Sequence, residues 1–570
     1  MDITALLNAL PNGVAQGLIW GIMGIGVYIT YKILDIADLS VDGTMVLGGA
    51  VCITMLLKGQ PMWLALLVAV ISGMLAGLAT GLFHTVMGIP AILAGIITQF
   101  GLWSINLKIL DNKANLAINA QKYHLISHMG SVKSTEANPI PFYQNTIFVV
   151  VVCAIVIIGI LYWFFGTERG ASLRATGCNP NMSRAQGINI NVNKVIGLMI
   201  SNGIVAFASA LLSQYTASVD INQGRGAIVI GLAAVVIGSA LFDKIFKNFA
   251  LKLVGVLLGG IIYYVVMRVI MWLGVVTGTS CSRIPCNPVL EKENLCQAGQ
   301  KGGCQIMLKV ENIYKTFNPN TVNEKTALNG LCLELNEGDF VTVIGGNGAG
   351  KSTLLNALAG TWLVDSGKIY IDNIDVTRIP EHRRAKYLGR VFQDPMMGTA
   401  ATMGIDENLA LAARRGKFRS LMPGITAKEK AQYKELLAEL DLGLENRITS
   451  KVGLLSGGQR QAITLLMASL KKPKLLLLDE HTAALDPKTA AKVLDTTEKI
   501  VQKDNLTTLM ITHNMKDAIA HGNRLIMMNS GNIIFDISGE EKKKLTVEDL
   551  LEKFAIASGK ELDNDRMMLG

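Results

Sequence analysis

The chain has 570 residues, of which 50% are hydrophobic and 17% charged, with 57 glycines and a formal net charge of +9. This composition is too apolar for an ordinary soluble protein, and it excludes a disordered, collagen-like or small disulfide-rich chain. Charged residues are sparse up to about residue 278 and frequent after it. We therefore predict a membrane domain over 1–278, a linker over 279–305 and a soluble domain over 306–570.

Eight hydrophobic runs follow one another in the first half of the chain. Each approaches the roughly 20 residues that a membrane-spanning helix needs, and several are rich in the small residues that allow such helices to pack closely. The first run has no basic stretch before it, so we do not expect a removed signal peptide. The runs occupy 14–31, 43–57, 62–84, 88–107, 146–166, 195–217, 226–242 and 250–277. A polytopic helical domain in a lipid bilayer is predicted.

Two loops between these runs are basic. The loop at 167–194 has four basic residues against Glu168 alone, and the segment 242–252 has three against Asp243. Basic loops beside membrane spans face the cytoplasm. Counting spans back from the first loop places the N-terminus outside. We therefore attribute the net positive charge to the basic cytoplasmic loops of a membrane protein, and we expect no nucleic-acid partner.

Four of the eight cysteines lie in the linker. Cys281, Cys286 and Cys296 lie in it and Cys304 near its end, with a spacing unlike the paired pattern of zinc sites. We predict a structureless connector and no metal site. Cys52 and Cys153 lie in apolar runs and are expected to be small buried residues.

From residue 306 on, short β-rich runs alternate with helical patterns, which predicts an α/β domain. Within it, the run VTVIGGNGAGKST places a glycine-rich loop between a buried strand and a helix. Glycines let successive amides turn toward one anion, and the helix adds its positive end. The residues expected to hold phosphate are Gly345, Gly346, Asn347, Gly348, Ala349, Gly350, Lys351, Ser352 and Thr353. Lys351 is expected at the β and γ phosphates of ATP, and Ser352 at Mg²⁺.

A second strand, KLLLLDEHTAALD, ends in Asp479 and Glu480. Four consecutive leucines favour a central parallel strand, whose carboxyl end lies beside the phosphate loop. Asp479 is predicted to hold Mg²⁺ through water, and Glu480 to polarise the attacking water.

With these elements, the segment LLSGGQRQ resembles the signature motif of ATP-binding-cassette (ABC) ATPases. The other motifs of that family match in order: Gln393 in VFQDP as the Q-loop, Asp486 in AALD as the D-loop and His513 in ITHN as the switch histidine. The resemblance implies that His513 senses the γ-phosphate, that Gln393 joins Ser352 and Asp479 at Mg²⁺, and that Phe317, or nearby Tyr314, stacks on adenine. The expected fold is a membrane domain followed by a P-loop α/β ATPase with a helical signature subdomain.

In ABC ATPases two nucleotide-binding domains close head to tail on two ATP molecules. The signature of one copy then faces the phosphate loop of the other. The hydroxyl of Ser456 and the amides of Gly457 and Gly458 would donate to the γ-phosphate in trans, and Gln459 and Asp486 are also expected among the ATP-binding residues. Because the chain has one copy of each motif, we expect a homodimer, or pairing with a second half-transporter.

The first half is similar to permeases of branched-chain amino-acid and ribose importers, and closest to those of tryptophan/tyrosine-type systems. The matching stretches are Asp38 to Val51, Arg174 to Ile190 and Gly224 to Phe242. In that class the second stretch is a cytoplasmic helix that docks on the ATPase beside the Q-loop, through residues that here include Arg174, Asn179 and Arg184. The resemblance implies an importer of a small polar solute, an amino acid, in the plasma membrane with its ATPase in the cytoplasm. Its cargo would come from a separate solute-binding protein.

Two other functions are considered. Exporters often fuse both domains in one chain, but their long cytoplasmic helices are absent here. A non-transport ATPase with a membrane anchor does not require eight hydrophobic runs.

Eight spans would bring the chain out on the wrong side for a cytoplasmic ATPase. Either one of the eight runs does not cross, or the membrane domain is one span short. Related permeases have one more span at this point, so we hypothesise that the fusion lost it and compromised the permease. Met87 to Pro90 and Ser40 to Gly43 are candidate substrate segments, or simply a kink and a loop. Asp42 is expected either to recognise a substrate amine or to end a helix.

Overall fold

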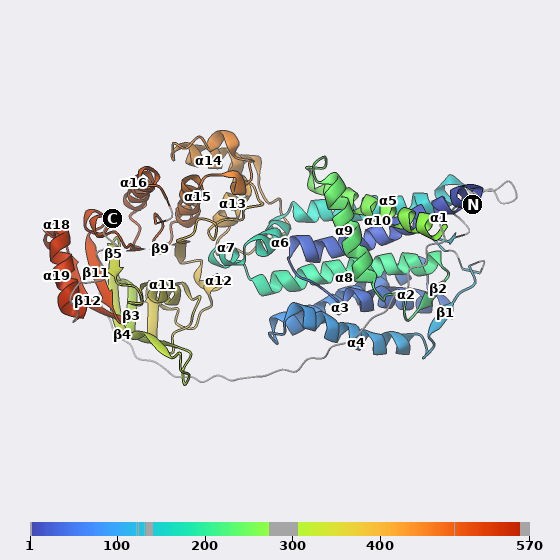
Figure 1. Ribbon diagram of the computed structural model, residues 1–570, viewed down its shortest axis with the longest axis horizontal. Coiled ribbons are helices and arrows are strands. Elements are labelled where there is room, and N and C mark those ends of the chain that lie inside the picture. The colour runs from blue at the N-terminus through green and yellow to red at the C-terminus, as the bar shows by residue number, and fades with distance from the viewer. Residues whose placement is uncertain are drawn as a thin grey trace. The chain divides into compact units, whose positions relative to one another are not determined.

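The structure is a computed structural model that describes residues 3–120, 122–123, 125–129, 132, 141–272, 306–483 and 485–558. The chain divides into two compact units, which we call the helical unit and the α/β unit (Figure 1). The helical unit comprises Met1–Cys178 and Ile190–Asn287, and the α/β unit comprises Asn179–Asn189 and Pro288–Gly570. The α/β unit therefore contains a short segment from the first half of the chain. The boundaries predicted at 278 and 305 lie outside the described residues, as do the four linker cysteines and the segment where a lost span was hypothesised.

The helical unit consists of helices of very different lengths. Their bounds are α1 Ile3–Tyr28 with the π-helix η1 Ile29–Ile33, α2 Val41–Leu57, α3 Met62–Thr85, α4 Ala91–Ile109, α5 Thr146–Phe165, α6 Glu168–Cys178, α8 Ile190–Tyr215, α9 Ala227–Phe242 and α10 Phe249–Trp272. Two short strands, β1 Asn115–Ala117 and β2 Ser218–Asp220, pair antiparallel, and a 3₁₀ turn covers Phe142–Gln144.

Each of the eight hydrophobic runs contains a helix, but these helices do not have equal lengths. In the described part of the chain, six helices are long and apolar enough to cross a membrane: α1 with η1, α3, α4, α5, α8 and α10. The other two apolar helices, α2 and α9, have 17 and 16 residues. At about 1.5 Å per residue they are shorter than the roughly 30 Å hydrocarbon core of a bilayer. Six candidate spans are thus fewer than the eight that the sequence predicts. They make this a multi-pass membrane unit.

Small residues bring the helices of this unit into close contact. A Cβ atom added at Gly48 of α2 would lie 2.2 Å from the carbonyl oxygen of Ala206 in α8, and one at Gly77 of α3 would lie 2.3 Å from that of Leu198. A Cβ at Gly17 of α1 would lie 2.7 Å from the Cα of Ile261 in α10. Without a hydrophobic force between helices in lipid, such backbone contact is a main source of their association.

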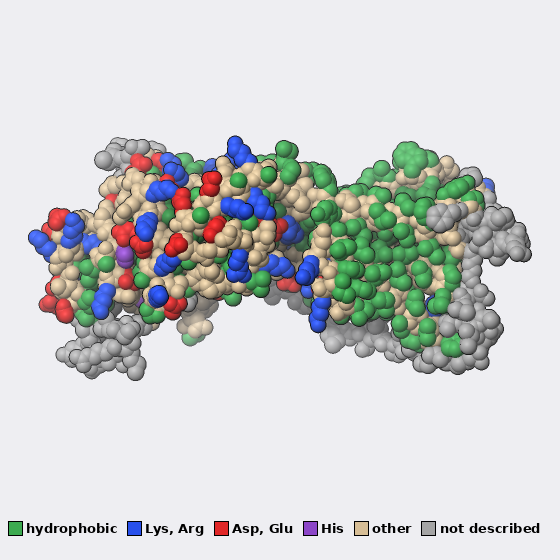
Figure 2. All heavy atoms as spheres, turned by 90° about the horizontal axis from the view of Figure 1, so that it is seen from above, with side chains coloured by type: hydrophobic (Ala, Val, Ile, Leu, Met, Phe, Trp, Pro, Cys, Tyr) green, Lys and Arg blue, Asp and Glu red, His purple; other side chains and the backbone are tan. Residues whose placement is uncertain are grey.

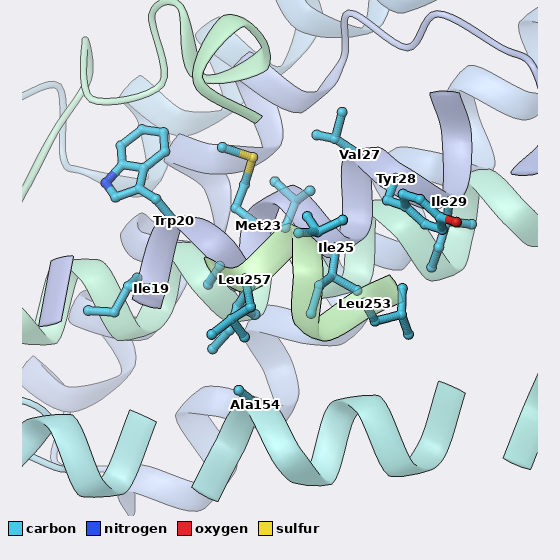
Figure 3. Close-up of a cluster of buried hydrophobic side chains, with 14 of the residues drawn as sticks. Ile19, Trp20, Met23, Ile25, Val27, Tyr28, Ile29, Ala154, Leu253 and Leu257 are labelled. Atoms are coloured by element: carbon cyan, nitrogen blue, oxygen red, sulfur yellow. The ribbon is translucent and has the colours of Figure 1, made fainter. Parts of the chain in front are cut away.

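The core of the unit forms around α1, which is buried by its neighbours. Figure 3 shows part of this core, in which Ile25 of α1 lies close to Leu253 and Leu257 of α10, while Trp20, Met23 and Val27 point away from Ala154 of α5. The labelled members are Ile19, Trp20, Met23, Ile25, Val27 and Tyr28 of α1, Ile29 of η1, Ala154 of α5, and Leu253 and Leu257 of α10. A central helix that is apolar on all sides is typical of a membrane bundle.

The two units have contrasting surfaces. In Figure 2 hydrophobic side chains predominate on the described part of the visible face of the helical unit, whereas basic and acidic side chains are scattered over the α/β unit. Trp63, Phe100 and Ile155 are among the exposed large hydrophobic residues of the helical unit. A continuous apolar surface of this kind is suited to contact with lipid.

The α/β unit contains two sheets. A six-stranded sheet has the order β12-β11-β5-β10-β9-β8, and in it only the edge strand β12 is antiparallel to its neighbour. A four-stranded antiparallel sheet has the order β4-β3-β6-β7. The first comprises β5 Phe340–Gly345, β8 Leu388–Val391, β9 Leu475–Asp479, β10 Thr508–Ile511, β11 Arg524–Asn529 and β12 Asn532–Ser538. The second comprises β3 Ile306–Phe317, β4 Lys325–Asn336, β6 Ser366–Ile371 and β7 Ile374–Asp375. The strand of four leucines is β9, and it lies between β10 and β8 as expected for a central parallel strand.

Helices complete the α/β unit. Their bounds are α11 Lys351–Ala359, α12 Glu381–Arg384, α13 Ile405–Ala413, α14 Ala427–Ala438, α15 Gly457–Ser469, α16 Pro487–Asp504, α17 Met515–Ala520, α18 Glu540–Lys543 and α19 Val547–Ser558, with 3₁₀ turns at Glu445–Arg447 and Val452–Leu454. Figure 1 shows α13, α14 and α15 together at one end of the unit. The signature motif begins α15, so the predicted α/β ATPase fold with a helical signature subdomain is confirmed.

Candidate active site

The glycine-rich loop joins β5 to α11 in the predicted strand–loop–helix order. Gly350 caps α11 with φ +98°, a conformation that L-residues rarely adopt. A Cβ atom at this position would lie 2.4 Å from the carbonyl oxygen of Ala327 in β4. Glycine is therefore required both for the turn and for the approach of β4. The loop delivers the N-terminus of α11, where backbone N–H groups can bind an anion.

A pocket of about 280 Å³ lies over this loop. It is lined by Phe317, Lys325, Ala327, Asn347, Gly348, Ala349, Gly350, Lys351, Ser352, Thr353, Glu480 and His513. Seven of the nine loop residues predicted from the sequence thus face one cavity. Gly345 and Gly346 instead direct their carbonyl groups to Lys351.

The aromatic residue of the pocket is Phe317, not the alternative Tyr314. Phe317 packs edge-on against Trp362, with ring centroids 4.8 Å apart and an interplanar angle of 76°. Sequence reasoning missed Lys325, which also lines the pocket and whose Nζ reaches to within 3.2 Å of a Cβ built on Gly348. Lys325 lies in no recognised motif, so only its place at the start of β4 brings it to the loop.

Lys351 is positioned by its own loop. Its Nζ donates hydrogen bonds to the carbonyl oxygens of Gly345 at 2.6 Å and Gly346 at 3.2 Å, and only 5% of the residue is exposed. Burial lowers the pKa of Lys351, while the nearby carboxylates of Glu480 and Asp479 oppose that shift. A cation is thereby fixed beside the amides that begin α11.

The two carboxylates after β9 differ in their surroundings. Asp479 ends the strand opposite Ile511 of β10, and burial raises its pKa against the opposing charge of Arg390. Glu480 follows with φ +43°, an uncommon conformation for a residue with a side chain. Strained backbone of this kind is concentrated at functional sites.

The carboxylate of Glu480 joins two other predicted site residues. Its Oε1 lies 2.6 Å from Nε2 of His513, and its Oε2 accepts a hydrogen bond of 2.9 Å from Nε2 of Gln393. Three residues chosen from separate motifs are therefore brought into direct contact. Only 8% of Glu480 is exposed to solvent.

The signature residues lie elsewhere on the α/β unit. Ser456 caps α15 and forms a reciprocal capping box with Gln459, with both hydrogen bonds at 3.3 Å. Asp486 likewise caps α16 by accepting a hydrogen bond from the backbone N–H of Thr489 at 3.0 Å. Among the residues described as lining the pocket, none comes from Ser456–Gln459 or is Asp486.

The short segment Asn179–Asn189 of the α/β unit includes helix α7 Pro180–Ala185. The Asn179 side chain accepts a hydrogen bond from the backbone of Met182, which caps α7. Its Nδ2 lies within hydrogen-bond distance of three carbonyl oxygens, those of Met396 at 3.0 Å, Met397 at 3.1 Å and Thr399 at 2.9 Å. These carbonyls follow closely after Gln393, so the segment lies beside the Q-loop as the resemblance implied.

Further contacts hold the end of this segment. Arg419 donates hydrogen bonds to the carbonyl oxygens of Gln186 at 2.8 Å and Gly187 at 3.3 Å. Burial raises the pKa of the Glu381 carboxyl, and the positive charges of Arg390 and Arg184 counteract this. Arg174 differs from the other predicted docking residues, because it belongs to α6 in the helical unit.

The candidate substrate segments of the helical unit have structural partners. Asp42, in the first turn of α2, accepts hydrogen bonds from the backbone N–H groups of Gly226 at 3.2 Å and Ile228 at 3.0 Å. It therefore caps the N-terminus of α9 rather than ending its own helix. Gly88, with φ +70°, lies in the turn between α3 and α4, where Nδ1 of His84 contacts the carbonyl oxygen of Ile89 at 2.9 Å.

A buried polar cluster precedes α2, and no sequence motif indicated it. The Asp38 carboxylate, 3% exposed, accepts hydrogen bonds from the Ser40 backbone at 2.9 Å, the Ser40 hydroxyl at 2.6 Å and Nδ2 of Asn202 at 2.8 Å. Asn202 lies in α8, and its Oδ1 accepts from the hydroxyl of Thr44 at 2.7 Å. The non-helical segment before α2 is thus bound to α8.

Both parts of the chain match known families. The family described as ABC transporter matches residues 328–483, and that described as branched-chain amino acid transport system / permease component matches residues 9–288. The tyrosine transport ATP-binding protein of Clostridioides difficile (strain R20291) is 46% identical over 252 residues, which are 44% of this chain and 100% of that protein. The tyrosine transport system permease protein of the same strain is 36% identical over 271 residues, 48% of this chain and 86% of that protein.

Among solved structures, a nucleotide-free ATP-binding cassette from an ABC transporter is 27% identical and covers 43% of this chain and 95% of its own, with a TM-score of 0.36. The sequence relatives are the stronger finding. Two separate proteins, a permease and an ATP-binding protein, each find their counterpart in this single polypeptide. The chain therefore belongs to the ABC transporters, as a fusion of permease and ATP-hydrolysing domain whose hydrolysis is coupled to transport across a membrane.

Proposed function

We propose that the protein imports an aromatic amino acid of the tyrosine class, driven by ATP. The observation that carries the proposal is that the relatives of both parts are named for tyrosine transport and come from one organism. A permease and an ATPase that serve the same solute in that organism are joined here.

We assign the nucleotide site as follows. The loop 345–353 binds the phosphates of ATP, with Lys351 at the β and γ phosphates, and Phe317 stacks on adenine. Support comes from the pocket over the loop, into which both side chains face. Glu480 polarises the attacking water and His513 contacts the γ-phosphate, which the direct contact between these two residues supports.

Mg²⁺ fits the donor set at this site. It prefers oxygen ligands and retains several waters, so it needs only one or two protein groups beside the phosphates. The Ser352 hydroxyl, the Asp479 carboxylate and the amide oxygen of Gln393 supply such groups. When bound, Mg²⁺ neutralises charge on the phosphates.

The working form is a homodimer in the plasma membrane, with its ATPase in the cytoplasm and cargo supplied by a separate solute-binding protein. The signature residues support this assembly, because Ser456 and Gly457 are exposed and lie outside the pocket of their own chain. In the dimer they and Asp486 face the nucleotide of the partner.

The test uses the full chain in proteoliposomes with its binding protein and labelled L-tyrosine. ATP on the side of the α/β unit should drive tyrosine toward that side. Glu480→Gln should retain ATP binding but lower the ATPase rate and uptake by about a hundredfold or more, because the attacking water is no longer polarised. Ordinary hydrolysis in Glu480→Gln would refute the assigned base, and ATP-driven movement of tyrosine in the opposite direction would refute import.

A further inference from the structure

The turn that carries Glu480 is held from two sides. The backbone N–H of Glu480 donates to the carbonyl of Ile511 in β10 at 3.1 Å, and its carbonyl accepts from Ala483 at 3.0 Å. These bonds keep the residue next to the sheet but do not alone account for its positive φ of 43°. A non-glycine residue in this conformation persists only where its surroundings impose it.

The next residue is a fully buried histidine. His481 is 2% exposed, and its Nε2 lies 3.1 Å from the hydroxyl oxygen of Thr497 on α16. The Thr497 hydroxyl donates its single proton to the carbonyl of Val493 at 2.8 Å. It therefore accepts from the imidazole, so Nε2 of His481 carries a proton and donates it.

The helix that supplies this acceptor is itself fixed nearby. Glu498, the residue after Thr497, lies 3.1 Å from Nδ1 of His521, which follows α17. Thr497 is 1% exposed, so water cannot replace the protein groups with which its hydroxyl forms hydrogen bonds. The imidazole of His481 thus meets an acceptor whose position is set by α16 on one side and by α17 on the other.

We propose that His481 is a positioning residue for ATP hydrolysis, which holds the strained turn so that the Glu480 carboxylate faces the nucleotide pocket. Its side chain points into the interior while that of Glu480 points to the pocket. The hydrogen bond to Thr497 prevents the turn from relaxing to an ordinary right-handed conformation. Such relaxation would move the carboxylate away from its contacts with Gln393 and His513.

This inference rests on the proposed role of Glu480, and the test separates the two. Thr497→Val replaces the hydroxyl by a methyl group and leaves every pocket residue in place, whereas Thr497→Ser keeps the hydroxyl. In the full chain we expect Thr497→Val to lower kcat for ATP about tenfold with an unchanged KM, because small misplacement of a reacting group reduces turnover steeply. Thr497→Ser should stay within about twofold of the unchanged protein on the same reasoning.

A merely structural role is distinguished in a Glu480→Gln background. If Thr497 acts through Glu480, adding Thr497→Val to Glu480→Gln should change the single-turnover rate by less than about twofold. An equal tenfold loss in both backgrounds, or an unchanged kcat in Thr497→Val alone, would overturn the inference. If instead Glu480→Gln itself hydrolyses normally, the proposed function of Glu480 is what fails.

Discussion

Two buried carboxylates, Glu480 in the α/β unit and Asp38 in the helical unit, are satisfied in different ways. The carboxylate of Glu480 contacts the side chains of Gln393 and His513, and it lines a pocket. Asp38 is held by the backbone and hydroxyl of Ser40 and by Asn202. A ligand can replace the partners of Glu480 without unfolding anything, whereas the partners of Asp38 connect two parts of the fold.

The difference reflects the surroundings of each unit. Polar groups within a membrane have no water as an alternative partner, so they are rare and must be paired inside the protein. Asp42 follows the same rule, since both of its oxygens accept from backbone N–H groups of α9. The buried carboxylate of Glu480 thus belongs to a pocket, whereas those of Asp38 and Asp42 join parts of the helical unit.

Removing a partner of Asp38 should have the largest effect on stability. Asn202→Leu leaves the buried carboxylate without one donor, and we expect a loss of about 3 kcal/mol in the free energy of unfolding. Denaturant unfolding in detergent measures it. Ser239→Ala is the control, because that hydroxyl bonds only within its own helix. An Asn202→Leu protein as stable as this control would contradict the comparison.

Removing Lys351, one of the two lysines described as lining the pocket, should weaken the binding of ATP. Lys351→Ala should raise the Kd for ATP about 30-fold, or about 2 kcal/mol, because charge-assisted bonds to phosphate are lost. Fluorescent nucleotide titration gives the affinity. Lys499→Ala, which removes one member of an exposed ion pair with Asp495, should leave affinity unchanged. Equal affinities for both variants would show that Lys351 does not contact the phosphates.

The smallest effect should come from the cap of α9. Asp42→Ala should lower the free energy of unfolding by about 1–2 kcal/mol, as for other lost helix caps, and Asp42→Asn by roughly half of that because one acceptor remains. Thermal unfolding in detergent ranks the three proteins. Loss of tyrosine uptake with unchanged stability would instead place Asp42 in substrate recognition, and the contrast between the two units would no longer hold.

The sequence predicts the α/β unit well because its chemistry is local. The phosphate loop and the leucine-rich strand β9 each occupy a few consecutive residues, and so does the signature motif, which begins α15 in the structure. Lys325 and His481 were not identified as parts of the site. Lys325 lies near Gly348, and His481 is hydrogen-bonded to Thr497, and neither neighbour is adjacent in the sequence.

The helical unit is less predictable for a physical reason. Hydropathy finds all eight runs, but it does not show that α2 follows a non-helical segment bound through Asp38 to Asn202, 164 residues away. Nor does it show that Asp42 caps a helix 184 to 186 residues further on. Hydropathy is the same for a polar residue near a membrane helix whether its side chain binds a substrate or accepts hydrogen bonds from backbone N–H groups.

The segment Asn179–Asn189 makes the α/β unit discontinuous in chain topology. An ATPase cut from this protein at its linker would lack eleven residues that lie against it, and with them the partners of the carbonyl groups after Gln393. The peptide bonds at either end of the segment are covalent tethers to the helical unit. The polypeptide therefore passes twice between the two units at the ends of this segment, in addition to the linker.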